Sequence, residues 1–482
     1  MRSSQEKDEF EIDHLDNIEA NTPGTEFTDH EKKKIIRRVD RRLVTMCGLT
    51  ACVSLMDRTN ISSAAIAGMN EDLQLTQDNR YSVVVLVFFI TYVLGQAPAT
   101  ATVRHFGARW FLSTLVLLWG VTMIAFGFLH TWQQMTALRL LLGLFEGGFF
   151  PGIIFLLSTW YVRYELQKRY AGYYIIGMVA SAFSGILAFG LTKMQGVGGL
   201  DGFRWIFIIE GILTCLVGGL CYAFLPDFPD YECKSISRMS FLSRAECMFM
   251  IHRVQQDRGD QDMEEFRWAK FFAPALDLKI WAFAIIFCAA TAVCYSVAYF
   301  LPIILSGSMG FSVGASQCLV APPYVFAGIV MAAEAWIGDR YHIRGPIIVA
   351  NCLMAVCGLA LMAYGQSAVV QFVGCFLLTA GGNSSIPSIL TYQANNIRGQ
   401  WSRAFSSASI VGFGGIGGIV GGLIFRTQDA PRYIPGTWAS IGLMLLVVAL
   451  VAALSIYFRL QNKRADRGEI VLEGHEGFRY TI

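Results

Sequence analysis

Long apolar stretches recur along this chain, separated by short polar or charged segments. Each stretch approaches the roughly 20 residues that a helix needs to cross the hydrocarbon core of a membrane. Backbone N–H and C=O groups find no water inside a bilayer, so each stretch is predicted to be helical. We place twelve membrane-spanning helices at residues 43–68, 81–103, 110–129, 133–157, 171–193, 203–225, 280–305, 317–337, 346–364, 367–391, 402–425 and 437–459.

Basic residues gather on one side of this arrangement. A cluster between Lys32 and Arg42 directly precedes the first apolar stretch. The short loops on the same side carry more Lys and Arg than the loops on the other side. Because cytoplasmic loops of membrane proteins carry this excess, we predict that both termini lie in the cytoplasm.

The longest polar segment divides the predicted helices into two groups of six. It opens with Pro226 and Pro229, which stop a helix, and Ser243 with Glu246 predicts a capped surface helix within it. The acidic, polar start of the chain is predicted to be disordered. The expected organisation is a disordered cytoplasmic tail at 1–42, an N-terminal six-helix bundle at 43–225, a cytoplasmic linker at 226–279, a C-terminal six-helix bundle at 280–459 and a cytoplasmic tail at 460–482.

Composition supports a membrane protein and argues against several other classes. The chain is 54% hydrophobic and 15% charged, whereas soluble domains carry about 25% charged residues. A net charge of +2 gives no basic footprint for nucleic acid. No C-x-x-C pair, no P-loop and no His near the centre of a predicted helix is present, so we predict no metal, no cofactor and no direct use of ATP.

Ionisable residues stand at the middle of two predicted helices. Asp57 and Arg58 lie at the midpoint of the first, and Glu146 at the midpoint of the fourth. A charge at that depth costs roughly 2.5–3.5 kcal/mol on insertion scales, so these side chains must face a partner or a wet cavity. Asp57 and Glu146 are candidate proton carriers, and Arg58 is a candidate to bind an anionic substrate. The alternative is a static ion-pair network that joins the two helices.

Further polar residues lie near this depth without a unique interpretation. Asn60 shares the helical face of Asp57, and Arg139 lies two turns before Glu146 on one face. Glu210 and Glu334 could each be a second titrating group or a buried structural partner, and a structural role is favoured. Several tyrosines, among them Tyr92, Tyr173, Tyr174, Tyr295 and Tyr299, suit either a cavity wall or ordinary packing.

These patterns resemble the major facilitator superfamily from about residue 40 to residue 460. The segment from Arg139 to Gly152 resembles the motif of that superfamily's fourth helix. Gly338-Asp339-Arg340 with Arg344 resembles its cytoplasmic loop motif between helices eight and nine. Within the superfamily, Asp57-Arg58-Thr59-Asn60-Ile61 and Gly143-Leu144-Phe145-Glu146-Gly147-Gly148 are similar to the anion:cation symporter branch, nearest to fungal allantoate, nicotinate and pantothenate permeases.

The resemblance implies the major facilitator fold of two six-helix bundles and the uptake of an organic anion with protons. It implies that Asp57 and Glu146 are the proton-coupling carboxyls and that Arg58, Asn60 and Arg139 form the substrate-binding network. It also implies a gating loop that contains Asp339, Arg340 and Arg344.

We therefore predict an all-α polytopic membrane protein that is a secondary active transporter and no enzyme. It would carry a small organic anion, a carboxylate or vitamin-like compound, with protons across a lipid bilayer, by alternating access. The plasma membrane is the expected location. Two alternatives stay open: export of a secondary metabolite or toxin, and a nutrient receptor that binds its ligand without transporting it.

Overall fold

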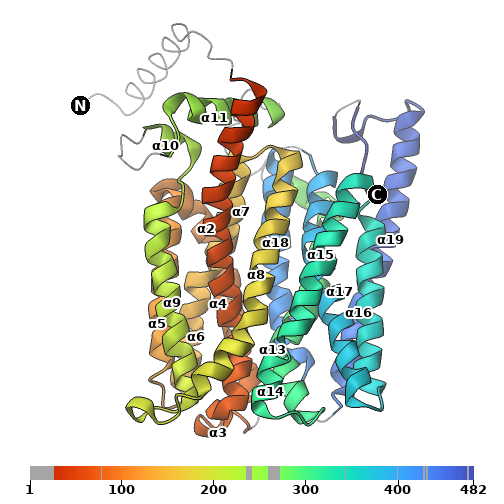
Figure 1. The fold of residues 1–482 in the computed structure, drawn as a ribbon. Coiled ribbons are helices and arrows are strands. Elements are labelled where there is room, and N and C mark those ends of the chain that lie inside the picture. Colours follow the sequence, from red (N-terminus) through yellow and green to blue (C-terminus); the bar gives the residue numbers. More distant parts are fainter. Residues whose placement is uncertain are drawn as a thin grey trace.

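A computed structural model describes residues 27–482 except 78, 235–240, 259–271, 342, 399, 427–428, 430–431 and 475–476. This part of the chain is helical and contains no strand. The long helices run side by side, and the start of α2 and the end of α19 lie at the same end of the bundle (Figure 1). We call this the terminal end and the opposite one the loop end.

The helices alternate in direction between these two ends. The first half contains α2 (Asp29–Ala64), η1 (Ala65–Met69), α3 (Asn70–Asp72), α4 (Arg80–Phe106), α5 (Ala108–Phe126), α6 (Trp132–Gly147), α7 (Phe149–Trp160), α8 (Arg163–Thr192) and α9 (Gly202–Phe224). Two short helices follow, α10 (Pro229–Lys234) and α11 (Arg244–Arg258). The second half contains α13 (Leu278–Gly307), α14 (Val313–Cys318), α15 (Ala321–Tyr341), α16 (Gly345–Tyr364), α17 (Ala368–Asn396), α18 (Gln400–Ile424) and α19 (Ile434–Asp466).

Ten helical stretches of the described residues are long and apolar enough to cross a membrane, with α6 and α7 counted as one stretch. The two remaining predicted spans correspond to α2 and α4. Polar residues around Asp57 lower the hydropathy of α2, and in α4 the stretch Arg80–Gln96 is the apolar part whose side chains are described. Both helices lie within the bundle beside the others (Figure 1), and the predicted all-α membrane fold is confirmed.

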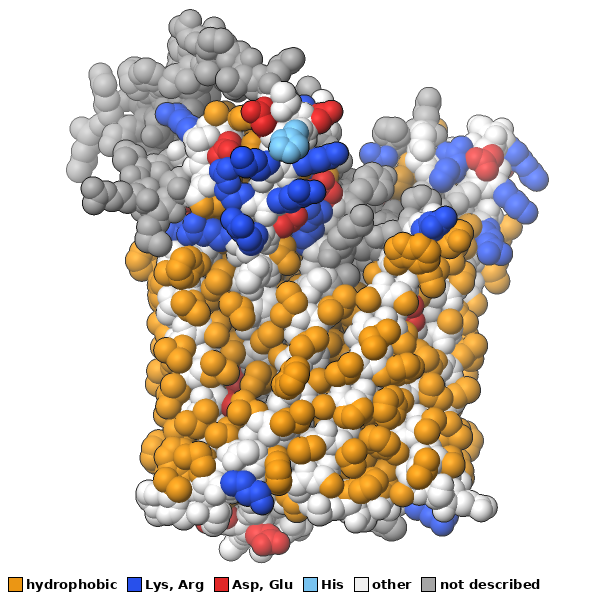
Figure 2. Space-filling model, viewed as in Figure 1, with side chains coloured by type: hydrophobic (Ala, Val, Ile, Leu, Met, Phe, Trp, Pro, Cys, Tyr) orange, Lys and Arg blue, Asp and Glu red, His pale blue; other side chains and the backbone are white. Residues whose placement is uncertain are grey.

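Charge and apolar surface are separated along the bundle. Figure 2 shows apolar side chains over the flank of the molecule and most of the visible Lys and Arg at the terminal end. An apolar flank of this height suits contact with lipid, and basic residues favour the cytoplasmic side of a membrane.

The start of the first helix differs from the sequence prediction, whereas the capped helix in the linker agrees with it. Residues 29–42 were expected to be disordered but form the first turns of α2. There the Thr28 N–H donates to the Glu31 carboxylate at 2.8 Å, and these capping bonds lower the pKa of Glu31. The capped helix predicted in the linker is confirmed, because the Ser243 N–H donates to Glu246 at 2.8 Å and α11 begins at Arg244.

The end of the chain also packs where a tail was expected. Helix α19 continues to Asp466, and the Tyr480 ring then stacks on Phe458 with 4.5 Å between centroids. Asn462 and the Tyr480 backbone exchange two hydrogen bonds of 2.9 Å. Burial raises the pKa of Tyr480 to about 12.

Glycines bring the fourth predicted span close to α4. This span is divided at Gly148, between α6 and α7. A Cβ on Gly143 would collide with the backbone carbonyl of Phe88, and one on Gly147 would collide with that of Tyr92. Glu146 lies between these two glycines, so the close approach of the backbones fixes its position.

We expect Gly143→Ala to lower the thermal unfolding midpoint of the purified protein. The added methyl group must displace α6 from α4, which costs about 1–3 kcal/mol for an overpacked site. Gly219→Ala in α9 is the matched control, since nothing lies within 4 Å of the Cβ it would add. Equal midpoints for the two variants would contradict the close packing of α6 on α4.

The two halves of the molecule are joined toward the loop end. The Tyr81 hydroxyl of α4 donates to the Tyr299 carbonyl of α13 at 3.4 Å. The Gln317 amide of α14 donates to the Ser63 carbonyl of α2 at 3.2 Å. Together with bonds made by Ser62 and Arg58, these are the hydrogen bonds that join described residues of the two halves. At the terminal end the outline is notched between the two halves (Figure 2).

Candidate functional site

Arg58 and Glu146 form an ion pair at the centre of the molecule. The Arg58 Nε donates to Glu146 Oε1 at 2.8 Å, and Nη2 lies 2.5 Å from the same oxygen. Ser54, one turn before Arg58 on α2, donates its hydroxyl to this oxygen at 2.7 Å. Glu146 Oε2 has no hydrogen-bond partner among the described residues. The structure therefore brings together two residues that the sequence placed at the same depth on different helices.

Arg58 also contacts the second half of the molecule. Its Nη1 donates to the Tyr295 hydroxyl of α13 at 2.6 Å, and its Nη2 lies 3.4 Å from the Tyr92 hydroxyl of α4. The guanidinium carbon lies 5.3 Å from the Tyr92 ring centre and 5.6 Å from that of Tyr295. One cation thus contacts a carboxylate and two aromatic rings at the interface between the halves.

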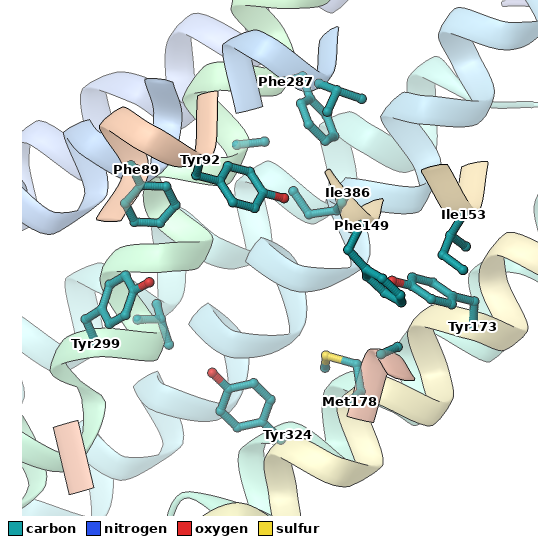
Figure 3. Close-up of a cluster of buried hydrophobic side chains, with 14 of the residues drawn as sticks. Phe89, Tyr92, Phe149, Ile153, Tyr173, Met178, Phe287, Tyr299, Tyr324 and Ile386 are labelled. Atoms are coloured by element: carbon teal, nitrogen blue, oxygen red, sulfur yellow. The ribbon is translucent and has the colours of Figure 1, made fainter. Parts of the chain in front are cut away.

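A cavity of about 60 Å³ adjoins this pair. Aromatic side chains from several helices reach toward it, and Figure 3 shows Tyr92, Phe149, Tyr173 and Phe287 around the central region. Arg58 and Glu146 are the charged side chains among its lining residues. The lining comprises Ser54, Leu55, Arg58, Tyr92, Glu146, Phe149, Phe150, Tyr173, Tyr174, Phe287, Thr291, Tyr295, Val411, Gly414 and Gly415.

Aromatic rings separate this cavity from the loop end. Phe89 packs edge-to-face on Tyr295 at 5.0 Å and on Tyr299 at 6.2 Å. Tyr299 lies one turn beyond Tyr295 on α13, in the direction of the loop end. In this conformation, bonds between the halves and packed rings close the loop-end side of the cavity.

Asp57 points away from the cavity, although it is adjacent to Arg58. It is 1% exposed and accepts a hydrogen bond from the Trp119 indole of α5 at 2.5 Å. The Thr214 hydroxyl of α9 lies 3.4 Å from the same oxygen, Asp57 Oδ2. Neighbouring residues point about 100° apart on a helix, which accounts for their different surroundings.

Asn60 lies on the same side of α2 as Asp57 and is not among the cavity-lining residues. Its amide donates to the Glu210 carboxylate of α9, and its Oδ1 accepts from the Ser184 hydroxyl at 3.3 Å. The predicted role of Asn60 in substrate binding has no support from its position in this conformation. Glu210, for which the sequence favoured a structural role, is 1% exposed beside it.

Arg139 is buried on the loop-end side of Glu146 and also does not line the cavity. It is 3% exposed, and its guanidinium carbon lies 5.9 Å from the Phe88 ring centre and 5.5 Å from that of Phe126. Within the described part of the chain it forms no ion pair, and its Nε has no hydrogen-bond partner. The structure thus separates Arg139 from the Arg58–Glu146 pair that it was expected to join.

The predicted gating-loop residues lie at the terminal end of the second half. Arg340 lies at the end of α15, with its guanidinium carbon 5.3 Å from the Trp336 ring centre. The Arg344 backbone N–H donates to the Ile482 carbonyl at 2.9 Å. The side chain of Asp339 lies outside the described residues. A gating role for these three residues stays a prediction.

The site combines a cation with a carboxyl group. Its cation is permanently charged and forked, and its carboxyl partner can be neutralised. Within the described residues, no group of three or more His, Cys, Asp or Glu side chains is placed to hold a metal ion.

Comparisons with known proteins identify the fold and the class. A family model described as Major Facilitator Superfamily matches residues 47–422. The high-affinity nicotinic acid transporter of Saccharomyces cerevisiae is 27% identical over 433 residues, covering 90% of this chain and 79% of that protein. The MFS transporter prlL of a fungal species, strain NRRL 50135, is 28% identical over 459 residues, covering 93% of this chain and 91% of that protein. The partially occluded, inward-open structure of the xylose transporter XylE from E. coli has a TM-score of 0.67 at 12% identity, covering 86% of this chain and 97% of that chain.

Proposed function

Because this chain belongs to the Major Facilitator Superfamily and is a membrane transporter rather than an enzyme, we propose that it carries a small organic anion together with protons. The observation that carries this proposal is the Arg58–Glu146 pair on the wall of the central cavity. It supplies a fixed cation whose present counter-ion is a carboxyl group.

The pair links anion binding to protonation through charge balance. An entering carboxylate competes with Glu146 for Arg58. If Glu146 stayed ionised after losing Arg58, it would be a buried charge without a partner, which costs about 3–5 kcal/mol. A proton on Glu146 removes this cost and leaves Arg58 free for the substrate. Anion and proton therefore bind together, which is the thermodynamic requirement for symport.

The cavity wall supports a compact monoanion with a flat apolar body. Tyr92, Tyr173, Tyr174 and Tyr295 present rings with polar tips, and Arg58 is the positive side chain of the lining. A dicarboxylate would leave one charge without a cation. The relative named a nicotinic acid transporter agrees with this chemistry, because nicotinic acid is an aromatic monocarboxylate.

Alternating access would move the two halves about this site. In the proposed cycle the present conformation, closed at the loop end, alternates with one in which the Tyr81–Tyr299 and Gln317–Ser63 bonds are broken. We place the terminal end in the cytoplasm because of its basic residues, and the protein in the plasma membrane. Asp57 is the second proton-coupling carboxyl in this scheme. Arg139, which forms no ion pair with a described residue, is available to a carboxyl in the other conformation.

Uptake of labelled anions into cells that express the chain tests the proposal. We expect an aromatic monocarboxylate to accumulate faster at about pH 5 than at about pH 7.5, by roughly tenfold per pH unit where one proton is limiting. A dicarboxylate and an uncharged amide of the same ring serve as controls and should accumulate little. Efflux down the opposite gradient in vesicles would instead identify an exporter, and saturable binding without accumulation would identify a receptor.

A further inference from the structure

We propose that Glu210 is a proton-holding residue of the transport cycle, which shares one proton with Asp57 across the contact between α2 and α9. The inference rests on the proposed proton-coupled function. It assigns a role to a carboxyl that does not line the cavity.

Crossed hydrogen bonds place the two carboxyls on facing turns. Asn60, one turn after Asp57 on α2, donates its amide to Glu210. Thr214, one turn after Glu210 on α9, has its hydroxyl 3.4 Å from Asp57 Oδ2 and donates to the Glu210 carbonyl at 2.9 Å. Each helix therefore supplies one carboxyl and one neutral group that reaches the other helix.

No positively charged group among the described residues bonds to either acid, although Arg139 acts on Asp57 through space. Their hydrogen-bond donors are an indole, a hydroxyl and an amide, all neutral, and neither acid forms an ion pair with a described residue. Asp57 Oδ1 and Glu210 Oε1 are buried without any hydrogen-bond partner in the described part of the chain. Two adjacent ionised carboxylates at this depth would each be desolvated and would repel each other. The two unpartnered oxygens are the places where a proton would reside.

The other charged and titratable groups around the pair are few. Helix α6 contributes Arg139 and Glu146, and α9 contributes Cys215 beside Asp57. Helix α5 directs the Trp119 indole at Asp57, and the Ser184 hydroxyl of α8 donates to Asn60. The segment η1 has no titratable residue. Arg58 is bonded to Glu146 on the opposite side of α2. When this pair loses a proton, a negative charge remains on it. Among the described residues, Arg139 alone balances that charge, and it acts through space without a direct bond.

The proton can move within the pair without changing its net charge. When Asp57 has released its proton, the O–H bond on Glu210 breaks and an O–H bond forms on Asp57. Glu210 then carries the negative charge, and the Asn60 amide stabilises it. Asp57 can then release a second proton. Later in the cycle, Glu210 takes up a proton from the other side of the membrane.

The second half of the molecule offers a matched control. Glu334 of α15 accepts a hydrogen bond from the Asn351 amide of α16 at 2.8 Å, as Glu210 does from Asn60. Among the described residues, no second carboxyl interacts with Glu334. The two Glu–Asn pairs have similar bonding, but the Glu334 pair lacks the shared proton.

Glu210→Gln and Glu334→Gln in the full-length protein, reconstituted in liposomes, test the inference. Glutamine keeps the oxygen that accepts from asparagine but cannot release a proton. We expect Glu210→Gln to displace the pH profile of uptake by about one pH unit. In the pH range where uptake changes with pH, this is an approximately tenfold change in uptake rate. The KM for the anion should be unchanged. A pH-sensitive dye should also record fewer protons per anion. Glu334→Gln should keep the wild-type profile and proton count.

A wild-type profile and proton count in Glu210→Gln would show that Glu210 is only structural, and would overturn the inference. If that variant does not fold, Asn60→Ala removes the donor to Glu210 and should move the profile toward higher pH; an unmoved profile overturns the inference equally. Wild-type uptake without any acid stimulation would instead refute the proposed function itself. The two failures are thus distinguishable.

Discussion

Arg58→Ala is expected to abolish accumulation of the anion at every pH. A hydrogen bond to a charged group contributes about 1.5–3 kcal/mol, so losing the Arg58 fork weakens anion binding by about 10- to 150-fold. The variant also leaves Glu146 buried without its cation, as Ser54 would be its remaining hydrogen-bond partner among the described residues. The measurement is equilibrium binding of the labelled anion to the purified protein, followed by uptake into liposomes.

Arg58→Lys separates the charge from the forked geometry. Lysine keeps the positive charge near Glu146, but it cannot reach Glu146, Tyr92 and Tyr295 with one planar group. We expect its binding to fall between the wild type and Arg58→Ala. Arg204→Lys is the matched control, because Arg204 is also buried but pairs with Asp72 away from the cavity, toward the loop end. Full binding by Arg58→Ala would place the anion at another site.

The membrane fold was predictable because lipid restricts the backbone so strongly. Every spanning segment must bond its own N–H and C=O groups, so apolar length alone indicates most of the helices. The break at Gly148 and the helical start at Asp29 were not predicted, because both depend on local geometry. The first follows from packing of α6 against α4, and the second from the capping bonds of Thr28.

The candidate site was predictable in its depth but not in its pairing. Counting along helices placed Asp57, Arg58 and Glu146 at one level. It could not show that Arg58, rather than Asp57, faces the cavity. That choice depends on how α2 is rotated against α6 and α9, which only the packing determines.

Several residues that complete the site gave little signal in the sequence. Trp119 of α5 and Thr214 of α9 are uncharged residues that bond to Asp57, and no pattern in the sequence linked them to it. Tyr92 and Tyr295 were recognised as compatible with a cavity wall, but an aromatic residue in an apolar helix packs in most cases. A structural role was favoured for Glu210, and the sequence did not show that Asn60 of α2 bonds to it.

Glu146→Gln is expected to separate anion binding from the proton gradient. Glutamine imitates the protonated carboxyl, so Arg58 is free for the substrate at any pH. At about pH 7.5 the variant should therefore bind the anion more tightly than the wild type, by up to about tenfold for each pH unit over which protonation limits binding to the wild type. The affinity of the variant should not change between about pH 7.5 and about pH 5. Exchange of labelled for unlabelled anion should continue, whereas accumulation driven by a pH gradient should be lost.

This combination distinguishes a coupling residue from a structural one. A merely structural Glu146 would give a variant that is weaker in binding, exchange and accumulation together, with the pH dependence intact. Glu334→Gln, which removes another carboxyl within the bundle but outside the cavity, should retain acid-stimulated accumulation. Since the Arg58–Glu146 pair is the charged feature of the cavity wall, acid-stimulated accumulation by Glu146→Gln would require a different carboxyl to carry the proton. The Asp57–Glu210 pair would then be the place to search, because its two acids are already close together and have no cation between them.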